Sequence, residues 1–137
     1  MAASQGTTNP SAKQRRTNRR SGRLLRHADF ERVYKEGQRH FSTHMTVFYL
    51  GRAGNEGLRV GFTVSRALGD AVDRNRMKRR LRESVRLTRP EQEPSADVVI
   101  NPKKSLLSAE FKSLLSEVTK AFSVIGQKLA EKQRTRH

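Results

Sequence analysis

The segment from Asp73 to Ser84, DRNRMKRRLRES, places the strongest constraint on the fold of this chain. It holds six basic residues and two acidic ones. Met77, Leu81 and Val85 recur at every fourth position, so on a helix they form one apolar stripe. This spacing predicts a helix over about residues 70–87, with the stripe packed against the rest of the domain. Like charges one turn apart repel each other, so such a helix is less stable alone than against an anionic partner.

The remaining sides of this predicted helix are cationic. A solvated helix face normally interleaves acids with bases, whereas here only Glu83 interrupts the run. The planar guanidinium group binds phosphate through two hydrogen bonds, which favours nucleic acid as the partner. The candidate nucleic-acid contacts are Arg74, Asn75, Arg76, Lys78, Arg79, Arg80 and Arg82. For Asn75 two roles stay open, a contact with the nucleic acid or a hydrogen bond that holds the start of the helix.

The charge of the whole chain agrees with a polyanionic partner. Its 137 residues include 29 Lys plus Arg against 13 Asp plus Glu, a formal net charge of +16. An anionic membrane surface is the weaker option, because the apolar stripe is narrow and is needed for the core. No apolar run approaches the roughly 20 residues that span a bilayer, no signal-peptide pattern opens the chain, and cysteine is absent. We therefore expect a cytoplasmic protein without disulfides.

By composition the chain divides into one domain and two basic ends. Residues 1–22 are polar and basic with almost no apolar content. They predict a disordered arm that either binds the partner or stays solvated. Residues 23–130 form the predicted domain, and residues 131–137 form a basic tail.

Within this domain the apolar patterns predict seven elements. HADFERVYKEG is a short helix whose start is favoured by Asp29 and whose end is marked by Gly37. RHFST is a short edge strand, HMTVFYLG and LRVGFTVS are longer strands, and DVVI is a buried strand that follows the basic helix. SAEFKSLLSEVTKAFSVIGQKLAEK is a long amphipathic helix. The order α-β-β-β-α-β-α predicts an α/β (α+β) sandwich with helices on a small mixed sheet.

Residues for protein-based catalysis are not apparent in this sequence. The four histidines lack metal-ligand spacing and are expected to be solvated. No glycine-rich phosphate loop and no pairing of a nucleophile with a base can be recognised. The carboxylates are scattered, whereas a nuclease made of protein alone usually clusters them around metal ions. We predict no catalytic residue and no metal site in the protein.

The run RVGFTVSRALGDAVDRNRMKRRLRESVR resembles the bacterial ribonuclease P protein component. Its Arg-Asn-Arg core, the Lys-Arg-Arg after it and the Gly-x-x-Val-Ser strand end before it are the signature of that family. RLLRHADFERVYKEG, TVFY and DVVI extend the resemblance in the order of the family. The resemblance implies an α-β-β-β-α-β-α fold with a left-handed βαβ crossover. It also implies an accessory subunit of an endoribonuclease, ribonuclease P, in which a catalytic RNA cleaves the 5′ leader from precursor tRNA.

The same resemblance implies partners and sites. The basic helix would dock on the ribonuclease P RNA, and a cleft between the first helix and the sheet would hold the single-stranded leader of precursor tRNA. The leader-binding cleft would consist of Arg23, Phe30, Tyr34, Tyr49, Ser65 and Arg66. Aromatic faces and a few cations suit an unpaired strand, although the i, i+4 spacing of Phe30 and Tyr34 alone favours ordinary core. No cofactor is expected on the protein alone, and Mg2+ is expected through the RNA subunit.

Three residues depart from the family pattern. Ala67 replaces a usual lysine, Asp70 replaces a usual asparagine, and Asp73 directly precedes Arg74. The two acids favour the start of a helix, but they also repel phosphate near Arg74.

The sequence leaves two other RNA- or DNA-binding classes to consider. A ribosomal or ribosome-assembly RNA-binding protein on a related fold would share the basic helix and tails but would need no aromatic cleft. A DNA-binding regulator is a weaker option, because no helix-turn-helix signature is present.

Overall fold

A computed structural model describes residues 26–54 and 56–135, with side chains described as far as residue 132. The predicted basic arm, residues 1–22, and the cleft residue Arg23 lie outside the described residues. The boundaries 1–22, 23–130 and 131–137 therefore stay a prediction.

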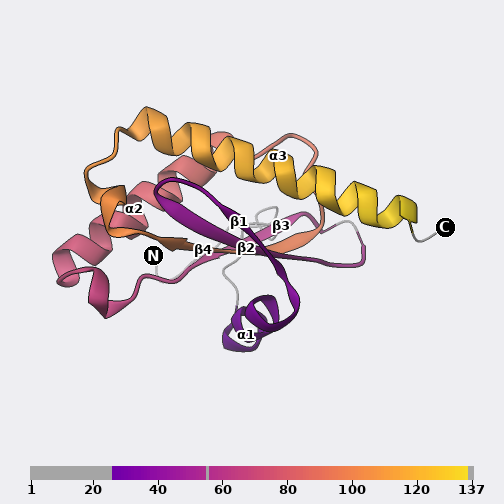
Figure 1. Cartoon of the computed structure of the whole chain (residues 1–137), viewed down its shortest axis with the longest axis horizontal. Coiled ribbons are helices and arrows are strands. Elements are labelled where there is room, and N and C mark those ends of the chain that lie inside the picture. Colours follow the sequence, from indigo (N-terminus) through magenta and orange to yellow (C-terminus); the bar gives the residue numbers. More distant parts are fainter. Residues whose placement is uncertain (1–25, 55, 136–137) are drawn as a thin grey trace, which may run out of the picture.

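The elements follow the predicted order α-β-β-β-α-β-α (Figure 1). The helices are α1 (His27–Glu36), α2 (Ala71–Thr88) and α3 (Phe111–Thr135). The strands are β1 (Gln38–Phe41), β2 (Met45–Gly51), β3 (Leu58–Phe62) and β4 (Ala96–Pro102). Two short 3-10 helices, η2 (Arg66–Leu68) and η3 (Lys104–Leu107), precede α2 and α3. The observed order confirms the predicted one.

The four strands form one mixed sheet in the order β1-β2-β4-β3. β1 pairs with β2 and β2 with β4 in antiparallel fashion, whereas β3 and β4 are parallel. α2 connects β3 to β4, so these three elements form a βαβ unit. β1 lies at one edge of the sheet, which confirms the predicted edge strand. The left-handed sense of the crossover stays a prediction.

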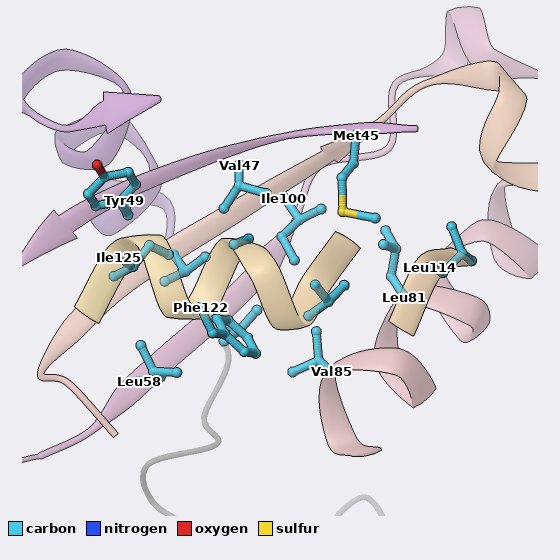
Figure 2. Packing of buried hydrophobic residues seen from close by; sticks show 14 of the residues in the cluster. Met45, Val47, Tyr49, Leu58, Leu81, Val85, Ile100, Leu114, Phe122 and Ile125 are labelled. Carbon is cyan, nitrogen blue, oxygen red and sulfur yellow. The ribbon is translucent and has the colours of Figure 1, made fainter. Parts of the chain in front are cut away.

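Helices cover both faces of this sheet, with α2 and α3 on one side and α1 on the other (Figure 1). The main core lies under α2 and α3, where the predicted stripe of Met77, Leu81 and Val85 is buried. Met45, Val47 and Tyr49 from β2 share this core with Leu114, Phe122 and Ile125 from α3 (Figure 2). The predicted packing of the basic helix is therefore confirmed.

A smaller apolar cluster lies under α1. Val33 from α1 and Val99 from β4 are fully buried there, and Phe30, Phe48 and Leu50 pack around them. Successive side chains of a strand point to opposite faces of the sheet. Phe48 and Leu50 therefore belong to the side of the sheet covered by α1, which we call the α1 face, whereas Val47 and Tyr49 belong to the main core.

Candidate nucleic-acid interface

The side of α2 that points away from the core carries cations that have no partner among the residues described. Asn75, Arg76, Arg79 and Arg82 are exposed, and Lys78 is half-buried. Within the described part of the chain, no hydrogen bond or ion pair holds the side chains of these five residues. A guanidinium group without a protein partner keeps its donors available for phosphate. We call these five residues the cationic face of α2.

The start of α2 is capped by Asp70 and not by Asn75. An Asp70 carboxylate oxygen accepts a hydrogen bond from the backbone N–H of Asp73 at 2.8 Å. Asp70 therefore supplies the N-cap interaction that stabilises the first turn. Arg74 is half-buried, and its Nε donates to the carbonyl of Gly69 at 3.2 Å. The Asn75 side chain is exposed and forms no hydrogen bond to the helix start. Of the two roles considered for it, holding the helix start is therefore not observed.

Arg80 was predicted among the nucleic-acid contacts, but the structure uses its guanidinium group inside the fold. Nη1 donates to the carbonyls of Leu106 and Leu107 at 2.8 and 2.9 Å, and Nη2 donates to the carbonyl of Ala109 at 2.6 Å. These carbonyls belong to η3 and to the segment that leads into α3. Three of its five N–H donors are thus occupied within the fold, and the assignment of Arg80 as a nucleic-acid contact stays a prediction.

The far end of α2 differs from the cationic face because its charges are paired. Arg86 donates from Nε to a Glu83 carboxylate oxygen at 3.1 Å, and a second contact joins the same two side chains. This hydrogen bonding lowers the pKa of Glu83. Beside this pair, a groove of about 470 Å³ runs between α2 and β3. Its lining includes the apolar side chains of Val60, Phe62 and Val85 together with Arg79 and Arg82.

On the α1 face, Tyr34 and Phe48 form an aromatic pair. Their ring centres lie 4.9 Å apart with an interplanar angle of 85°. Tyr34 is 39% exposed, and its hydroxyl lies 2.8 Å from Thr63 Oγ1 and 3.0 Å from Asn101 Oδ1. Phe30 is half-buried against the small cluster under α1. The structure thus gives Phe30 a partial core role and leaves Tyr34 accessible to a ligand.

The predicted cleft residue Tyr49 lies on the other face of the sheet. Its side chain is 3% exposed in the main core, and its hydroxyl donates to Gln38 Oε1 at 3.0 Å. Burial raises the pKa of this phenol. The placement of Tyr49 in the leader-binding cleft is therefore wrong. Phe48 is the β2 aromatic residue on the α1 face, and the strict alternation in MTVFYLG is the signal that separates the two.

Ser65 and Arg66 are exposed where the chain leaves β3 and enters η2. Thr63, which contacts the Tyr34 hydroxyl, precedes Ser65 by two residues. The predicted cleft residues Phe30 and Tyr34 thus lie on one helix, with Ser65 and Arg66 following the strand end that Tyr34 touches. Ala67, where the family pattern has lysine, is exposed beside them.

Two residues that the sequence analysis missed extend the aromatic surface toward the sheet edge. The Arg39 guanidinium carbon lies 5.8 Å from the centre of the Phe48 ring and 6.0 Å from that of Phe41. Both distances fall within the range of cation–π contacts. The sequence signal for this contact was Phe41, a large apolar residue in a strand that was predicted to lie at the edge of the sheet.

A buried ion cluster, also missed, joins α1 to the sheet. Asp97 in β4 is 1% exposed and accepts two hydrogen bonds from Arg59, at 2.8 and 2.9 Å. Arg52 Nε lies 2.9 Å from the same carboxylate, and Arg59 lies 3.5 Å from Asp29 on α1. Hydrogen bonds from the Arg26 backbone and the Arg32 side chain lower the pKa of Asp29. The first of these bonds confirms that Asp29 favours the helix start.

We expect Asp97→Ala to destabilise the fold by about 3 kcal/mol, because it leaves two partly buried arginines without their carboxylate. Denaturant unfolding monitored by circular dichroism measures this loss. The matched control is Glu83→Ala, which removes a carboxylate from an exposed pair with Arg86 and should change stability by less than about 0.5 kcal/mol. Equal, small effects of both variants would show that the buried cluster contributes nothing particular to stability.

The histidines and carboxylates of the described residues do not form a metal centre. In residues 26–54 and 56–132, no group of three or more His, Cys, Asp or Glu side chains is placed to hold a metal ion. The prediction that the histidines are solvated is wrong for His44, which is half-buried with Nδ1 2.8 Å from Ser105 Oγ. His40 is half-buried as well, and burial lowers its pKa. None of the described helices is long and apolar enough to cross a membrane.

Comparison with known proteins finds one family whose members are similar to most of this chain. The family model for Ribonuclease P matches residues 19–126. The ribonuclease P protein component of Oleidesulfovibrio alaskensis is 46% identical over 88 residues, which cover 64% of this chain and 70% of the relative. That of an Exiguobacterium species is 39% identical over 104 residues, which cover 74% of this chain and 90% of the relative.

Solved structures agree with the fold. The RNase P protein from Thermotoga maritima superposes with a TM-score of 0.65 at 26% identity, covering 73% of this chain and 94% of that one. A mutant RNase P protein from Staphylococcus aureus gives a TM-score of 0.66 at 23% identity, covering 80% of this chain and 92% of that one. At this lower identity the second likeness supports the fold alone.

Proposed function

The chain belongs to the ribonuclease P protein family, and from this premise we propose that it binds two RNAs on two different surfaces. As a member of this family it is a subunit of an endoribonuclease that takes part in tRNA processing, and ribonuclease P RNA is its partner. The cationic face of α2 binds that RNA, and the α1 face binds the single-stranded 5′ leader of precursor tRNA. The complex acts in the cytoplasm.

The proposal for α2 rests on the unpaired cations. A cation that is paired with a carboxylate, as Arg86 is with Glu83, has fewer donors left for phosphate. Arg76, Arg79 and Arg82 have no such partner in the described part of the chain. The apolar groove beside Arg79 and Arg82 adds a surface on which a base can pack. The opposite side of α2 packs in the main core and stabilises the fold. The residues proposed to bind RNA therefore differ from those that stabilise the fold.

The proposal for the α1 face rests on the exposed Tyr34, which lies next to polar groups. Tyr34 is 39% exposed, and its hydroxyl is held by Thr63, directly after β3, and by Asn101 on β4. A fixed, exposed ring suits an unpaired base, because stacking tolerates any base and costs little ordering of the protein. A double-stranded RNA would not expose base faces to such a ring.

The observation that carries the proposal is the separation of the two surfaces. The cationic face belongs to α2, which covers one side of the sheet, whereas α1 covers the other side (Figure 1). Tyr34 of α1 packs against Phe48 on that other side. A subunit that only stabilises one structured RNA needs no second, aromatic surface. A protein that holds a catalytic RNA and its substrate together does need two.

The substrate part of the proposal is tested with Tyr34→Ala. Loss of one stacked base should weaken binding of precursor tRNA to the holoenzyme by about 1–3 kcal/mol. Mature tRNA lacks the leader, so its affinity should change little. Equilibrium binding of both tRNAs to wild-type and variant holoenzyme gives the comparison.

Tyr34→Phe is the control, since it keeps the ring and removes the hydroxyl contacts with Thr63 and Asn101. We expect this variant to retain most of the preference for precursor tRNA. Equal losses for precursor and mature tRNA with Tyr34→Ala would contradict leader binding on the α1 face and indicate a general folding defect.

A further inference from the structure

Phe41 is a large apolar side chain that neither core cluster contains. It is 66% exposed at the end of β1, the edge strand of the sheet. Phe41 pairs with Thr46 in β2, and Arg39 pairs with Phe48. Because directly paired residues point to the same side of a sheet, Phe41 and Arg39 lie on the α1 face together with Phe48. A single exposed apolar residue is common in proteins, so exposure alone assigns Phe41 no role.

The contacts of Arg39 connect Phe41 to the aromatic pair described above. Its guanidinium carbon lies 5.8 Å from the Phe48 ring centre and 6.0 Å from the Phe41 ring centre. Phe48 in turn packs edge-to-face with Tyr34, with 4.9 Å between ring centres. The four side chains therefore form one continuous row from α1 to the edge of the sheet, with three rings and one cation. We call them the aromatic row.

This composition matches an unpaired nucleic acid strand. Rings supply stacking surfaces for successive bases, and an arginine between rings can stack on a base while it offsets phosphate charge. Arg39 is exposed and forms no ion pair within the described residues, so its charge is available to a phosphate. A protein partner would instead require a larger apolar patch than one ring at an edge.

We propose that Phe41 and Arg39 extend the leader-binding surface, so that a further unpaired base stacks on Phe41 and Arg39 contacts its phosphate backbone. This inference rests on the proposed function of the α1 face. β1 lies at the sheet edge opposite β3, and β3 leads into the docking helix α2. Phe41 therefore contacts leader nucleotides that lie beyond the one on Tyr34, further from the docked RNA.

The test is a series of precursor tRNAs whose leaders are shortened one nucleotide at a time. With long leaders, Phe41→Ala should weaken binding to the holoenzyme about five- to tenfold. The deficit should disappear once the leader is too short to reach β1. Phe41→Trp, which keeps a ring, should bind as the wild type does, whereas Phe41→Leu, which keeps only the apolar character, should behave like Phe41→Ala.

Three results would contradict a role of Phe41 in leader binding. The first is that Phe41→Ala weakens binding equally for all leader lengths, and the second is that Phe41→Leu binds with full affinity. The third is that Phe41→Ala has no effect while Tyr34→Ala loses the preference for precursor tRNA, in which case leader binding on the α1 face stands and only the role of Phe41 is refuted. If neither variant affects leader binding, the proposed function of the α1 face falls with it. Because Phe41 is exposed, all its variants are expected to fold, which circular dichroism verifies.

Discussion

Replacing both Arg79 and Arg82 with alanine should weaken assembly of the protein with ribonuclease P RNA by about 3–4 kcal/mol. Each charge-assisted hydrogen bond to phosphate is worth about 1.5–3 kcal/mol, with exposure and salt favouring the lower end. The affinity should also depend less on salt, because two fewer phosphates are neutralised. The slope of log K against the logarithm of the salt concentration should become shallower by about 1.5–2. Filter-binding or fluorescence titrations over a range of potassium chloride concentrations measure both quantities.

The variant should fold normally, since Met77, Leu81 and Val85 hold α2 to the sheet from its other side. The matched control is the double variant Lys112→Ala and Lys128→Ala, which removes the same charge from exposed positions on α3. It should leave affinity and salt slope nearly unchanged. Equal losses for the two double variants would mean that net charge, and not the cationic face of α2, governs assembly.

The helices of this fold could be predicted because their signals are local. In α2 the stripe repeats with the helical period, and in α1 the apolar residues and Gly37 mark both face and end. The sheet order could not be predicted in the same way. β4 inserts between β2 and β3, and this pairing joins residues far apart in the chain that carry no mutual signal in a single sequence.

The error at Tyr49 has a physical reason. Phe48 and Tyr49 are neighbours in β2, so one of them must face α1 and the other the main core. Which aromatic residue faces which side depends on where α1 packs, and that depends on Val33 and Val99 meeting under the helix. The resemblance supplied an aromatic residue at the end of TVFY, but the pleat of the strand decides which one lies next to Tyr34.

The contacts of Arg80 and of Asp97 could not be predicted for a related reason. Arg80 lies on the same basic helix as Arg79, and only the position of η3 shows that its donors meet backbone carbonyls. Asp97 begins the apolar run DVVI, and only the pairing of β3 with β4 shows that Arg59 lies opposite it. In both cases a cation forms hydrogen bonds within the fold that the sequence alone does not reveal.

We expect the purified protein to cleave no precursor tRNA on its own, at any magnesium concentration. We propose that the chemistry belongs to the RNA subunit and that the magnesium ions are held by the RNA and its substrate. In the described residues, the carboxylates of Asp29 and Asp97 are ion-paired with arginines that join elements of the fold. The family name of the relatives, protein component, is consistent with a second component of the enzyme. Adding the ribonuclease P RNA to the protein should give cleavage at the 5′ end of the mature tRNA.

The dependence of cleavage on magnesium provides a second test of this expectation. Protein cations and magnesium ions both offset the repulsion between the catalytic RNA and its substrate, so each should substitute partly for the other. Cleavage by the RNA should therefore depend strongly on the protein at low magnesium and weakly at high magnesium, and the deficit of the Arg79/Arg82 double variant should shrink along the same series. A protein that acts by positioning and charge, not by proton transfer, must behave in this way. The measurement is a cleavage time course with protein alone, RNA alone and both. Site-specific cleavage by rigorously RNA-free protein would refute the assignment of the chemistry to the RNA.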